Sequence, residues 1–254
     1  MSKKKSRYKK RKIISSIILI ISISAMLFSG YKIIAWFEDN KKSKQIAEEI
    51  SNAVVVIEHA KAGAEKQYEI DFNNLKSKND ETVGWIKVNG TDIEYPVVKT
   101  KDNDYYMNHS FDKSYNGAGW IFVDCETKLD GTDRNIVIFG HNRRDGSMFG
   151  TLKNILTEQW YSDEQNYIIP FVLETEECKY QVFSVYTIEA EDYYITTEFA
   201  NDSEFEGFLN DIKQRSVKDF GVKITAKDKI LTLSTCADNN KYRVVLHAKK
   251  IANR

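Results

Sequence analysis

Eight short segments rich in Val, Ile, Tyr and Phe constrain the fold more than any other feature of the sequence. In chain order they are TVGWIKV, DIEYPVV, GWIFVDC, RNIVIFG, YIIPFVLE, KYQVFSVYTI, KILTLSTC and YRVVLHAKKI. Gly, Asn and Asp lie between them, and this alternation is typical of strands joined by turns. The segments predict a mainly β domain built on a closed or nearly closed eight-stranded β-barrel.

Helical patterns interrupt and precede these segments. NDSEFEGFLNDIKQRS opens with residues that cap helices and carries apolar residues on one face, so it predicts a helix inserted before KILTLSTC. SMFGTLKNIL predicts a shorter helix, and ETEECK predicts a hairpin connection. Upstream, apolar residues recur at helical spacing from Ile46 to Ala60. They predict an amphipathic helix that packs on the domain or spaces it from a membrane.

Charge is strongly segregated along the chain. The first twelve residues hold eight of the 37 basic residues and no acidic residue, which leaves residues 13–254 with 29 basic and 37 acidic groups, a net charge of −8. An acidic body argues against nucleic acid as a partner. The next run, IISSIILIISISAMLFSGY, has no charged residue and is long enough as a helix to cross a bilayer core of ~30 Å.

This run is longer than the apolar region of a cleaved signal peptide, which is the alternative. With basic residues on its N-terminal side, it predicts a single-pass anchor with a cytoplasmic N-terminus and an extracellular domain. We expect a basic tail at 1–12, a transmembrane anchor at 13–37, a juxtamembrane helical segment at 38–70 and the β-barrel domain at 71–254. HExxH, CxxC, GxGxxG and P-loop patterns are missing from the sequence, so we expect no metal and no cofactor.

Cys236 is the candidate nucleophile. It ends the segment KILTLSTC on the same strand face as Thr232 and Ser234, where a thiol can meet solvent and substrate. Arg243 follows at the start of the next segment, and its fixed charge and forked donors could hold a substrate carbonyl or stabilise an oxyanion. The alternatives are a packed thiol and a surface arginine. We expect the remaining cysteines, Cys125 and Cys178, to pack as small apolar side chains.

A cysteine nucleophile needs a proton partner, and His141 has the most suitable setting. It follows the apolar segment NIVIFG and begins a polar turn. His109, in a loop, remains possible, whereas His59 falls in the predicted juxtamembrane helix. His247 lies four residues beyond Arg243, or ~13 Å along a strand, so we expect it to be structural or exposed.

Together, TLSTC, the arginine after it and IFGHN upstream resemble a sortase, a membrane-anchored cysteine transpeptidase of Gram-positive bacteria. TVGWIKVNGTDIEYPVV, KDNDYYMNHSF, HNRRDGSMFGTLKNIL and the inserted helix at 201–216 look like class B in particular. The resemblance covers residues from about 70 to 250. It implies that Cys236 is the nucleophile, that His141 is the general acid and base, and that Arg243 orients the substrate or supports the oxyanion.

The resemblance also implies a groove for the substrate peptide, lined by Asn103, Met107, Phe139, Tyr194, Ile195, Ser234 and Asp238. Phe139 departs from the family pattern, in which a tyrosine is frequent, so any hydroxyl contact there is lost.

The implied reaction cleaves a C-terminal sorting signal similar to NPxTN or xPxTG after its Thr and forms a thioacyl intermediate on Cys236. The protein is then transferred to an amino group of peptidoglycan or its lipid-linked precursor. Implied partners are secreted proteins bearing such signals, this acceptor and the cell membrane. A pilin-joining sortase, a hydrolytic cysteine peptidase and a catalytically silent scaffold remain as alternatives.

Overall fold

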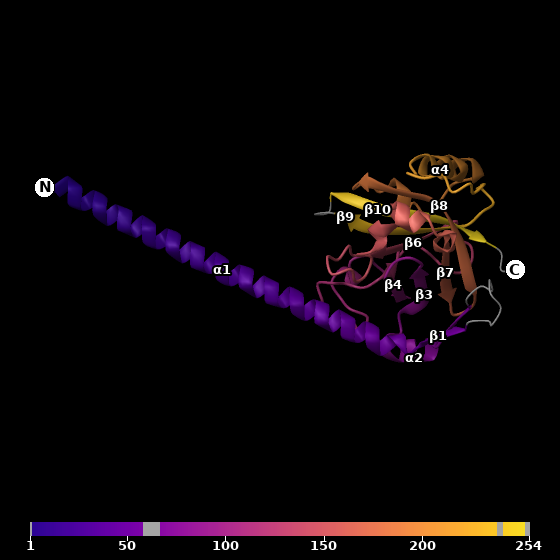
Figure 1. Cartoon of the computed structure of the whole chain (residues 1–254), viewed down its shortest axis with the longest axis horizontal. Coiled ribbons are helices and arrows are strands. Elements are labelled where there is room, and N and C mark those ends of the chain that lie inside the picture. Colours follow the sequence, from indigo (N-terminus) through magenta and orange to yellow (C-terminus); the bar gives the residue numbers. More distant parts are fainter. Residues whose placement is uncertain (1, 58–66, 238–240, 252–254) are drawn as a thin grey trace. The chain divides into compact units, whose positions relative to one another are not determined.

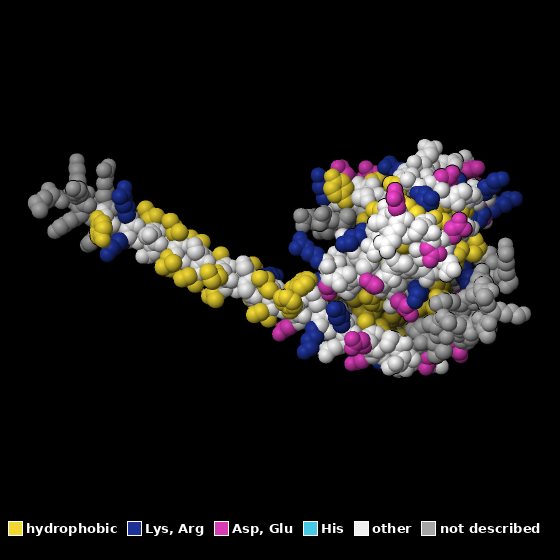
Figure 2. All heavy atoms as spheres, viewed as in Figure 1, with side chains coloured by type: hydrophobic (Ala, Val, Ile, Leu, Met, Phe, Trp, Pro, Cys, Tyr) yellow, Lys and Arg dark blue, Asp and Glu magenta, His cyan; other side chains and the backbone are white. Residues whose placement is uncertain are grey.

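The computed structural model of the chain describes residues 2–57, 67–237 and 241–251. The chain divides into two compact units, Met1–Lys42 and Ser43–Arg254 (Figure 1). Helix α1 (Ser2–Ser51) makes up the first unit and contributes its last turns to the second. Its stretch Arg11–Ser51 is long and apolar enough to cross a membrane, and apolar side chains are exposed along it (Figure 2).

The helical segment predicted from Ile46 to Ala60 is wrong at Val54–Ile57, which form a strand. Ile46 and Ile50 do lie on one helix face and are buried in the second unit. Strand β1 (Val54–Ile57) follows and pairs antiparallel with β2 (Gln67–Ile70). Four successive β-branched residues explain the change, since such residues favour strands over helices. His59 and Ala60 lie in 58–66, outside the described residues.

The second unit is built on a closed barrel with the strand order β10-β8-β7-β3-β4-β5-β6-β9. The strands are β3 (Thr82–Val88), β4 (Ile93–Val98), β5 (Phe122–Val123), β6 (Asn135–Gly140), β7 (Ile168–Leu173), β8 (Glu177–Glu189), β9 (Ile230–Ala237) and β10 (Tyr242–Ile251). Each predicted segment overlaps one of them, which confirms the eight-stranded barrel, and β8 extends beyond its segment at both ends. Residues 174–176 join β7 to β8 as the predicted hairpin connection.

Short helical elements occupy the connections. They are α2 (Phe72–Lys78), η1 (Tyr105–Met107), η2 (Leu152–Leu156), α3 (Glu158–Tyr161), η3 (Glu164–Tyr167), η4 (Tyr193–Ile195) and α4 (Asp202–Gln214). Helix α4 is the predicted inserted helix, and the Asn201 side chain caps it by accepting from the Glu204 N–H at 3.0 Å. The helix predicted in SMFGTLKNIL is only the 3₁₀ turn η2, because Met148 has a left-handed φ of 54° that an α-helix excludes.

Strands β9 and β10 are buried on both faces. Leu231, Leu233 and Leu246 belong to the core inside the barrel. The alternate residues face outward, where Ile230 and Val245 join a second core together with residues of α4 and η4, namely Phe205, Leu209, Ile212 and Tyr194. Helix α4 lies outside the barrel near β8 (Figure 1). Because both faces are covered, a side chain of β9 can meet substrate only near the end of the strand. Cys178 is buried in the barrel core as expected, whereas Cys125 is partly exposed.

His247 is the structural histidine of β10. It is fully buried on the outward face, with Nε2 2.9 Å from the Tyr186 hydroxyl and Nδ1 2.8 Å from Thr232 Oγ1. Burial lowers the pKa of its imidazole from the ordinary 6.5 to about 3, because the charged form would lose its hydration. His247 is therefore neutral in the folded protein at neutral pH.

This neutral histidine makes the fold sensitive to acid. The unfolded chain protonates the imidazole below about pH 6.5, whereas the folded domain does so only near pH 3. The stability that neutral His247 contributes is complete above pH 6.5 and is lost progressively as the pH falls. We expect the free energy of unfolding to drop by roughly 1 kcal/mol per pH unit between about pH 6 and pH 4 on this account. Urea unfolding of the wild type and of His247→Gln measures it: the variant should show the shallower slope, and equal slopes would contradict a neutral His247.

Candidate active site

The strand register brings three of the predicted residues to one end of the barrel. Across the antiparallel β9–β10 pair, Cys236 lies opposite Arg243. Across the parallel β6–β9 pair, Gly140 lies beside Thr235, so His141 and Cys236 are each one residue past that position. Neighbouring strands lie ~4.8 Å apart, and the three backbone positions therefore sit side by side in the order Arg243, Cys236, His141. The Cys236 side chain lies outside the described part of the structure, as does all of Asp238.

His141 is half-exposed and its ring is held by a backbone carbonyl. Its Nε2 lies 2.7 Å from the carbonyl oxygen of Met107. A carbonyl can only accept, so Nε2 carries the proton and Nδ1 remains for proton exchange. The backbone carbonyl of His141 accepts from the N–H groups of Arg143 at 3.1 Å and Phe149 at 3.0 Å. Both the ring and the backbone of this histidine are thus fixed from outside β6.

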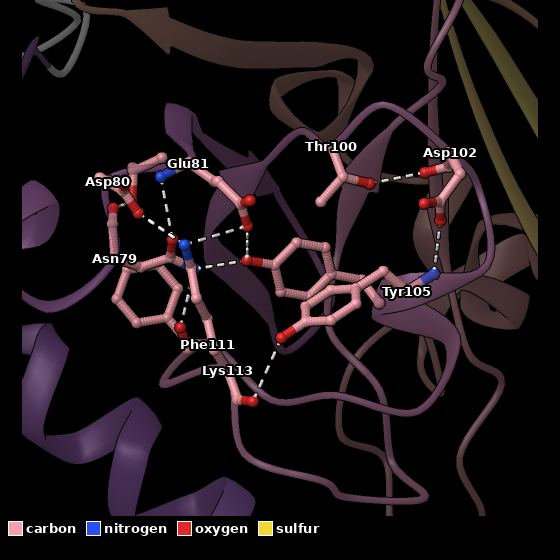
Figure 3. A network of polar contacts seen from close by, with 10 residues as sticks. Asn79, Asp80, Glu81, Thr100, Asp102, Tyr105, Phe111 and Lys113 are labelled. Atoms are coloured by element: carbon pink, nitrogen blue, oxygen red, sulfur yellow. Dashed lines mark hydrogen bonds and ion pairs between the residues drawn. The ribbon is translucent and has the colours of Figure 1, made fainter.

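A largely buried polar network fixes the segment that carries Met107. The Tyr106 hydroxyl accepts from Asn79 Nδ2 at 2.7 Å and donates to Glu81 Oε2 at 2.6 Å. Asn79 Nδ2 also donates to the Phe111 carbonyl at 2.8 Å (Figure 3). Burial, and next the Glu81 hydrogen bond, raise the pKa of Tyr106, so its hydroxyl stays protonated as a donor. The carbonyl that orients His141 therefore belongs to a segment held by side chains near the start of β3.

Gly119 provides the space in which the His141 ring and this segment meet. Its φ is +61°, a conformation that glycine adopts at little cost. A Cβ atom at this position would lie 2.5 Å from the Tyr106 carbonyl oxygen and 2.8 Å from His141 Cδ2. Our reading of the sequence missed Gly119, although two glycines within NGAGW indicate a chain with unusual backbone angles.

Arg243 comes from the second residue of β10. Its backbone lies between Cys236 on one neighbouring strand and Ile188 on the other. The side chain is half-buried, and Nη1 donates to the Tyr242 carbonyl at 3.4 Å. A guanidinium remains charged at any working pH, so Arg243 provides a permanent positive charge on the strand next to β9, which carries Cys236.

Two of the residues assigned to the substrate groove contact each other. The Tyr194 hydroxyl and Ser234 Oγ are 2.9 Å apart and buried, which ties η4 to β9 two residues before Cys236. Ile195 follows in η4 and is half-buried against the same outer core. Phe139, in register with Ser234, packs its ring on Phe122 with centroids 5.4 Å apart.

The remaining groove assignments differ in their surroundings. Met107 has an exposed side chain, at 39% of its full area, beside His141. Asn103 has its amide engaged within the protein: Nδ2 donates to Asp124 Oδ2 at 2.9 Å, and Oδ1 accepts from the Cys125 N–H at 2.8 Å. These bonds join two loops, so any contact of Asn103 with a peptide has to coexist with them.

Other candidate groups lie elsewhere. The His109 ring stacks on Tyr105 at 4.0 Å, and its Nδ1 lies 2.7 Å from the Tyr105 carbonyl oxygen. In the part of the chain that the structure describes, no three His, Cys, Asp or Glu side chains are grouped as metal ligands would be. A cavity of about 240 Å³ opens between residues 126–134 and 197–199, and none of the groove residues lines it.

Comparisons with known proteins identify the family of the chain. Residues 86–251 match the sortase domain family. Sortase B of Listeria monocytogenes is 34% identical over 235 residues, which cover 91% of this chain and 94% of that protein. Sortase B of Staphylococcus aureus is 32% identical over 239 residues, covering 93% and 96%. The crystal structure of sortase B from Bacillus anthracis superposes with a TM-score of 0.73 at 34% identity, covering 85% of this chain and all of that one.

A closed barrel with this family match defines a sortase, an enzyme of the transpeptidase class. The chain belongs to the sortase family, and its relatives place it in class B.

The position of Gly119 gives a test of how His141 is held. Gly119→Ala should lower kcat for cleavage of a sorting peptide by about 10-fold or more, because the added methyl displaces the histidine ring or the Met107 carbonyl. Gly221→Ala is the matched control: it has a similar φ of +69°, and nothing lies within 4 Å of its added Cβ. Both variants place an alanine at a similar positive φ and so introduce similar backbone strain. Equal kcat values for the two variants would therefore exclude a positioning role for Gly119.

Proposed function

We propose that this sortase is a cysteine transpeptidase that anchors secreted proteins to the cell wall of a Gram-positive bacterium. It cleaves a C-terminal sorting signal of the NPxTN or xPxTG kind after Thr and transfers the new carboxyl end to an amino group of peptidoglycan or its lipid-linked precursor. The observation that carries the proposal is the strand register. It places Cys236 opposite Arg243 on β10, and it pairs the preceding residue, Thr235, with Gly140, which directly precedes His141, in a member of class B.

The chemistry follows from these three groups. The Cys236 thiolate attacks the carbonyl carbon of the signal's Thr, and the Arg243 guanidinium stabilises the oxyanion that forms. The imidazolium of His141 gives its Nδ1 proton to the departing amine as the C–N bond breaks, leaving a thioester on Cys236. The acceptor amine then attacks the thioester, His141 takes the amine's proton, and the thiolate leaves. The bond from Nε2 to the Met107 carbonyl persists through both steps and supports the charged ring.

The N-terminal helix fits an enzyme that works at a membrane surface. The basic residues before the apolar stretch favour a cytoplasmic N-terminus, which places the barrel outside the cell. A secreted substrate whose signal lies near its C-terminus then reaches the enzyme along one membrane surface, without free diffusion in three dimensions.

We assign the peptide groove to the residues near the Cys236 end of β9. The exposed Met107 side chain beside His141 supports this assignment most directly, and the buried Tyr194–Ser234 hydrogen bond joins η4 to β9 beneath the groove. Phe139 and Ile195 would supply apolar walls, and Asn103 would act through the loops it joins. Asp238 completes the proposed set.

Two other activities would use the same nucleophile. A pilin-joining sortase would transfer the acyl group to a side-chain amine of another protein, and a hydrolytic cysteine peptidase would transfer it to water. The product formed in the presence of an amine separates the peptidase from the two transpeptidases, and the kind of amine that is accepted separates pilin joining from wall anchoring.

The decisive experiment uses the full chain in detergent micelles with quenched fluorescent peptides carrying NPxTN and xPxTG signals. Each peptide is incubated with and without an added amine, for the wild type and for Cys236→Ala. We expect Cys236-dependent cleavage with the amine captured in the product. Cleavage without capture would indicate a peptidase, and no cleavage together with a thiol that resists alkylation would indicate a silent scaffold.

The oxyanion role of Arg243 has its own test. Arg243→Lys keeps the positive charge and loses the planar fork of donors, so we expect kcat/KM to fall ~10²-fold, the usual cost of one oxyanion donor. Arg134→Lys is the control, because Arg134 pairs with Asp202 at 2.5 Å and lies before the opposite end of β6. An Arg243→Lys enzyme with near-normal kcat/KM would rule out the proposed role.

A further inference from the structure

A chain of buried hydrogen bonds crosses the outward face of the barrel next to the groove and is not used by the reaction described above. We propose that this chain, centred on His247, positions the segment 193–196 and thereby Tyr194 and Ile195, which we assign to the sorting-peptide groove. His247 is then a positioning residue for substrate binding, an assignment that rests on the proposed function.

One half of the chain runs from His247 to the first residue of η4. The Tyr193 hydroxyl donates to the Tyr186 hydroxyl at 3.2 Å, and the Tyr186 hydroxyl lies 2.9 Å from His247 Nε2. Tyr186 is on β8 and His247 is on β10, so two neighbouring strands hold Tyr193. The Arg215 guanidinium lies 4.6 Å from the centre of the Tyr193 ring and covers it from the α4 side.

The other half runs from His247 to the residue just after η4. His247 Nδ1 lies 2.8 Å from Thr232 Oγ1, which donates to Asn135 Oδ1 at 2.7 Å. Asn135 Nδ2 in turn donates to the carbonyl oxygen of Thr196 at 2.9 Å. Both ends of the chain therefore terminate on one four-residue segment, at Tyr193 and Thr196, with Tyr194 between them.

The donors in this chain all point in one direction. The Thr232 hydroxyl has one proton, which it donates to Asn135 Oδ1. Its oxygen must therefore accept from the Nδ1–H of His247. Nε2 of the neutral ring then accepts from Tyr186, whose oxygen accepts from Tyr193. Burial raises the pKa of Tyr186, and burial keeps His247 neutral, as this order requires.

The chain connects to the groove through Tyr194. Its hydroxyl is 2.9 Å from Ser234 Oγ, and Ser234 shares the outward face of β9 with Thr232. The segment is thus fixed at Tyr193, Tyr194 and Thr196 by side chains from β6, β8, β9 and β10. A buried polar network holds one geometry only when each member is satisfied, so removal of one hydroxyl should release the segment.

The test again uses the full chain in detergent, with Tyr186→Phe and Tyr193→Phe as the variants. Each removes one hydroxyl, and we expect KM for the sorting peptide to rise about 3- to 10-fold, the equivalent of one hydrogen bond. The values of kcat and the rate of Cys236 alkylation by a small thiol reagent should change less than about twofold. Tyr167→Phe is the matched control, since its hydroxyl donates to the Tyr161 carbonyl at 2.6 Å outside the chain.

A second pair of variants separates the hydroxyl from the side-chain volume. Thr232→Val keeps the shape without the hydroxyl and should raise KM, whereas Thr232→Ser keeps the hydroxyl and should rescue KM relative to Thr232→Val. If Tyr186→Phe lowers kcat and the alkylation rate as much as it raises KM, the chain supports only the general fold and the proposal is overturned.

Hydrogen exchange keeps this proposal distinct from the proposed function. In Tyr186→Phe we expect faster amide exchange within residues 193–196 and unchanged exchange in β3 and β4. Unchanged exchange at 193–196 overturns the proposal whatever the activity. A wild-type enzyme that cleaves no sorting peptide overturns the proposed function instead, and exchange alone then decides whether the chain holds the segment.

Discussion

The parallel pairing of β6 with β9 is the interaction on which the rest of the site depends. It runs from the Asn135–Ile230 pair to the Gly140–Thr235 pair, so both strands end at the same rim of the barrel. Parallel neighbours require a long crossover connection, and the chain uses residues 141–229 for it, which include β7, β8 and α4. The antiparallel turn back into β10 then brings Arg243 to the rim from the other side. The proposed nucleophile, acid–base group and cation are thus brought together by strand order, although 94 residues lie between His141 and Cys236.

Two networks of polar side chains fix the positions of groups that strand register alone determines only approximately. On the β6 side, Asn79, Tyr106 and Glu81 hold the segment whose Met107 carbonyl fixes the proton on His141 Nε2. On the β10 side, His247 and its partners hold the segment that carries Tyr194. The first network contacts the histidine that we propose as the acid–base group, and the second holds a segment that we assign to the substrate groove. The central bonds of both networks are buried, where a displaced polar group loses its partner without gaining water, so small shifts are resisted.

Local patterns predicted most of the fold. Strand composition located all eight barrel strands, and the Asn201 cap located α4, because both signals depend on residues close in the sequence. The predicted juxtamembrane helix extends too far beyond Ser51, because its apolar spacing is helical although Val54–Ile57 are all β-branched and form a strand. The site was predicted as a set of residue types, and its assembly was not, since the pairing of β6 with β9 is non-local. The support from Gly119 and Met107 was also missed, because a backbone carbonyl and a missing Cβ leave little trace in residue type.

Closure of the barrel restricts how an extended peptide can be recognised. Each barrel strand already has hydrogen-bonded neighbours on both sides, so the sheet offers a peptide no complete edge to extend. Binding must then come from side chains and loops, without a ladder of backbone bonds to enforce register. The proline of the proposed sorting signals lacks an N–H and would interrupt such a ladder, so it would carry no penalty at a site without one. Its fixed φ would instead reduce the conformational freedom that the peptide loses on binding, so a closed barrel is compatible with the proline-containing signals that we propose.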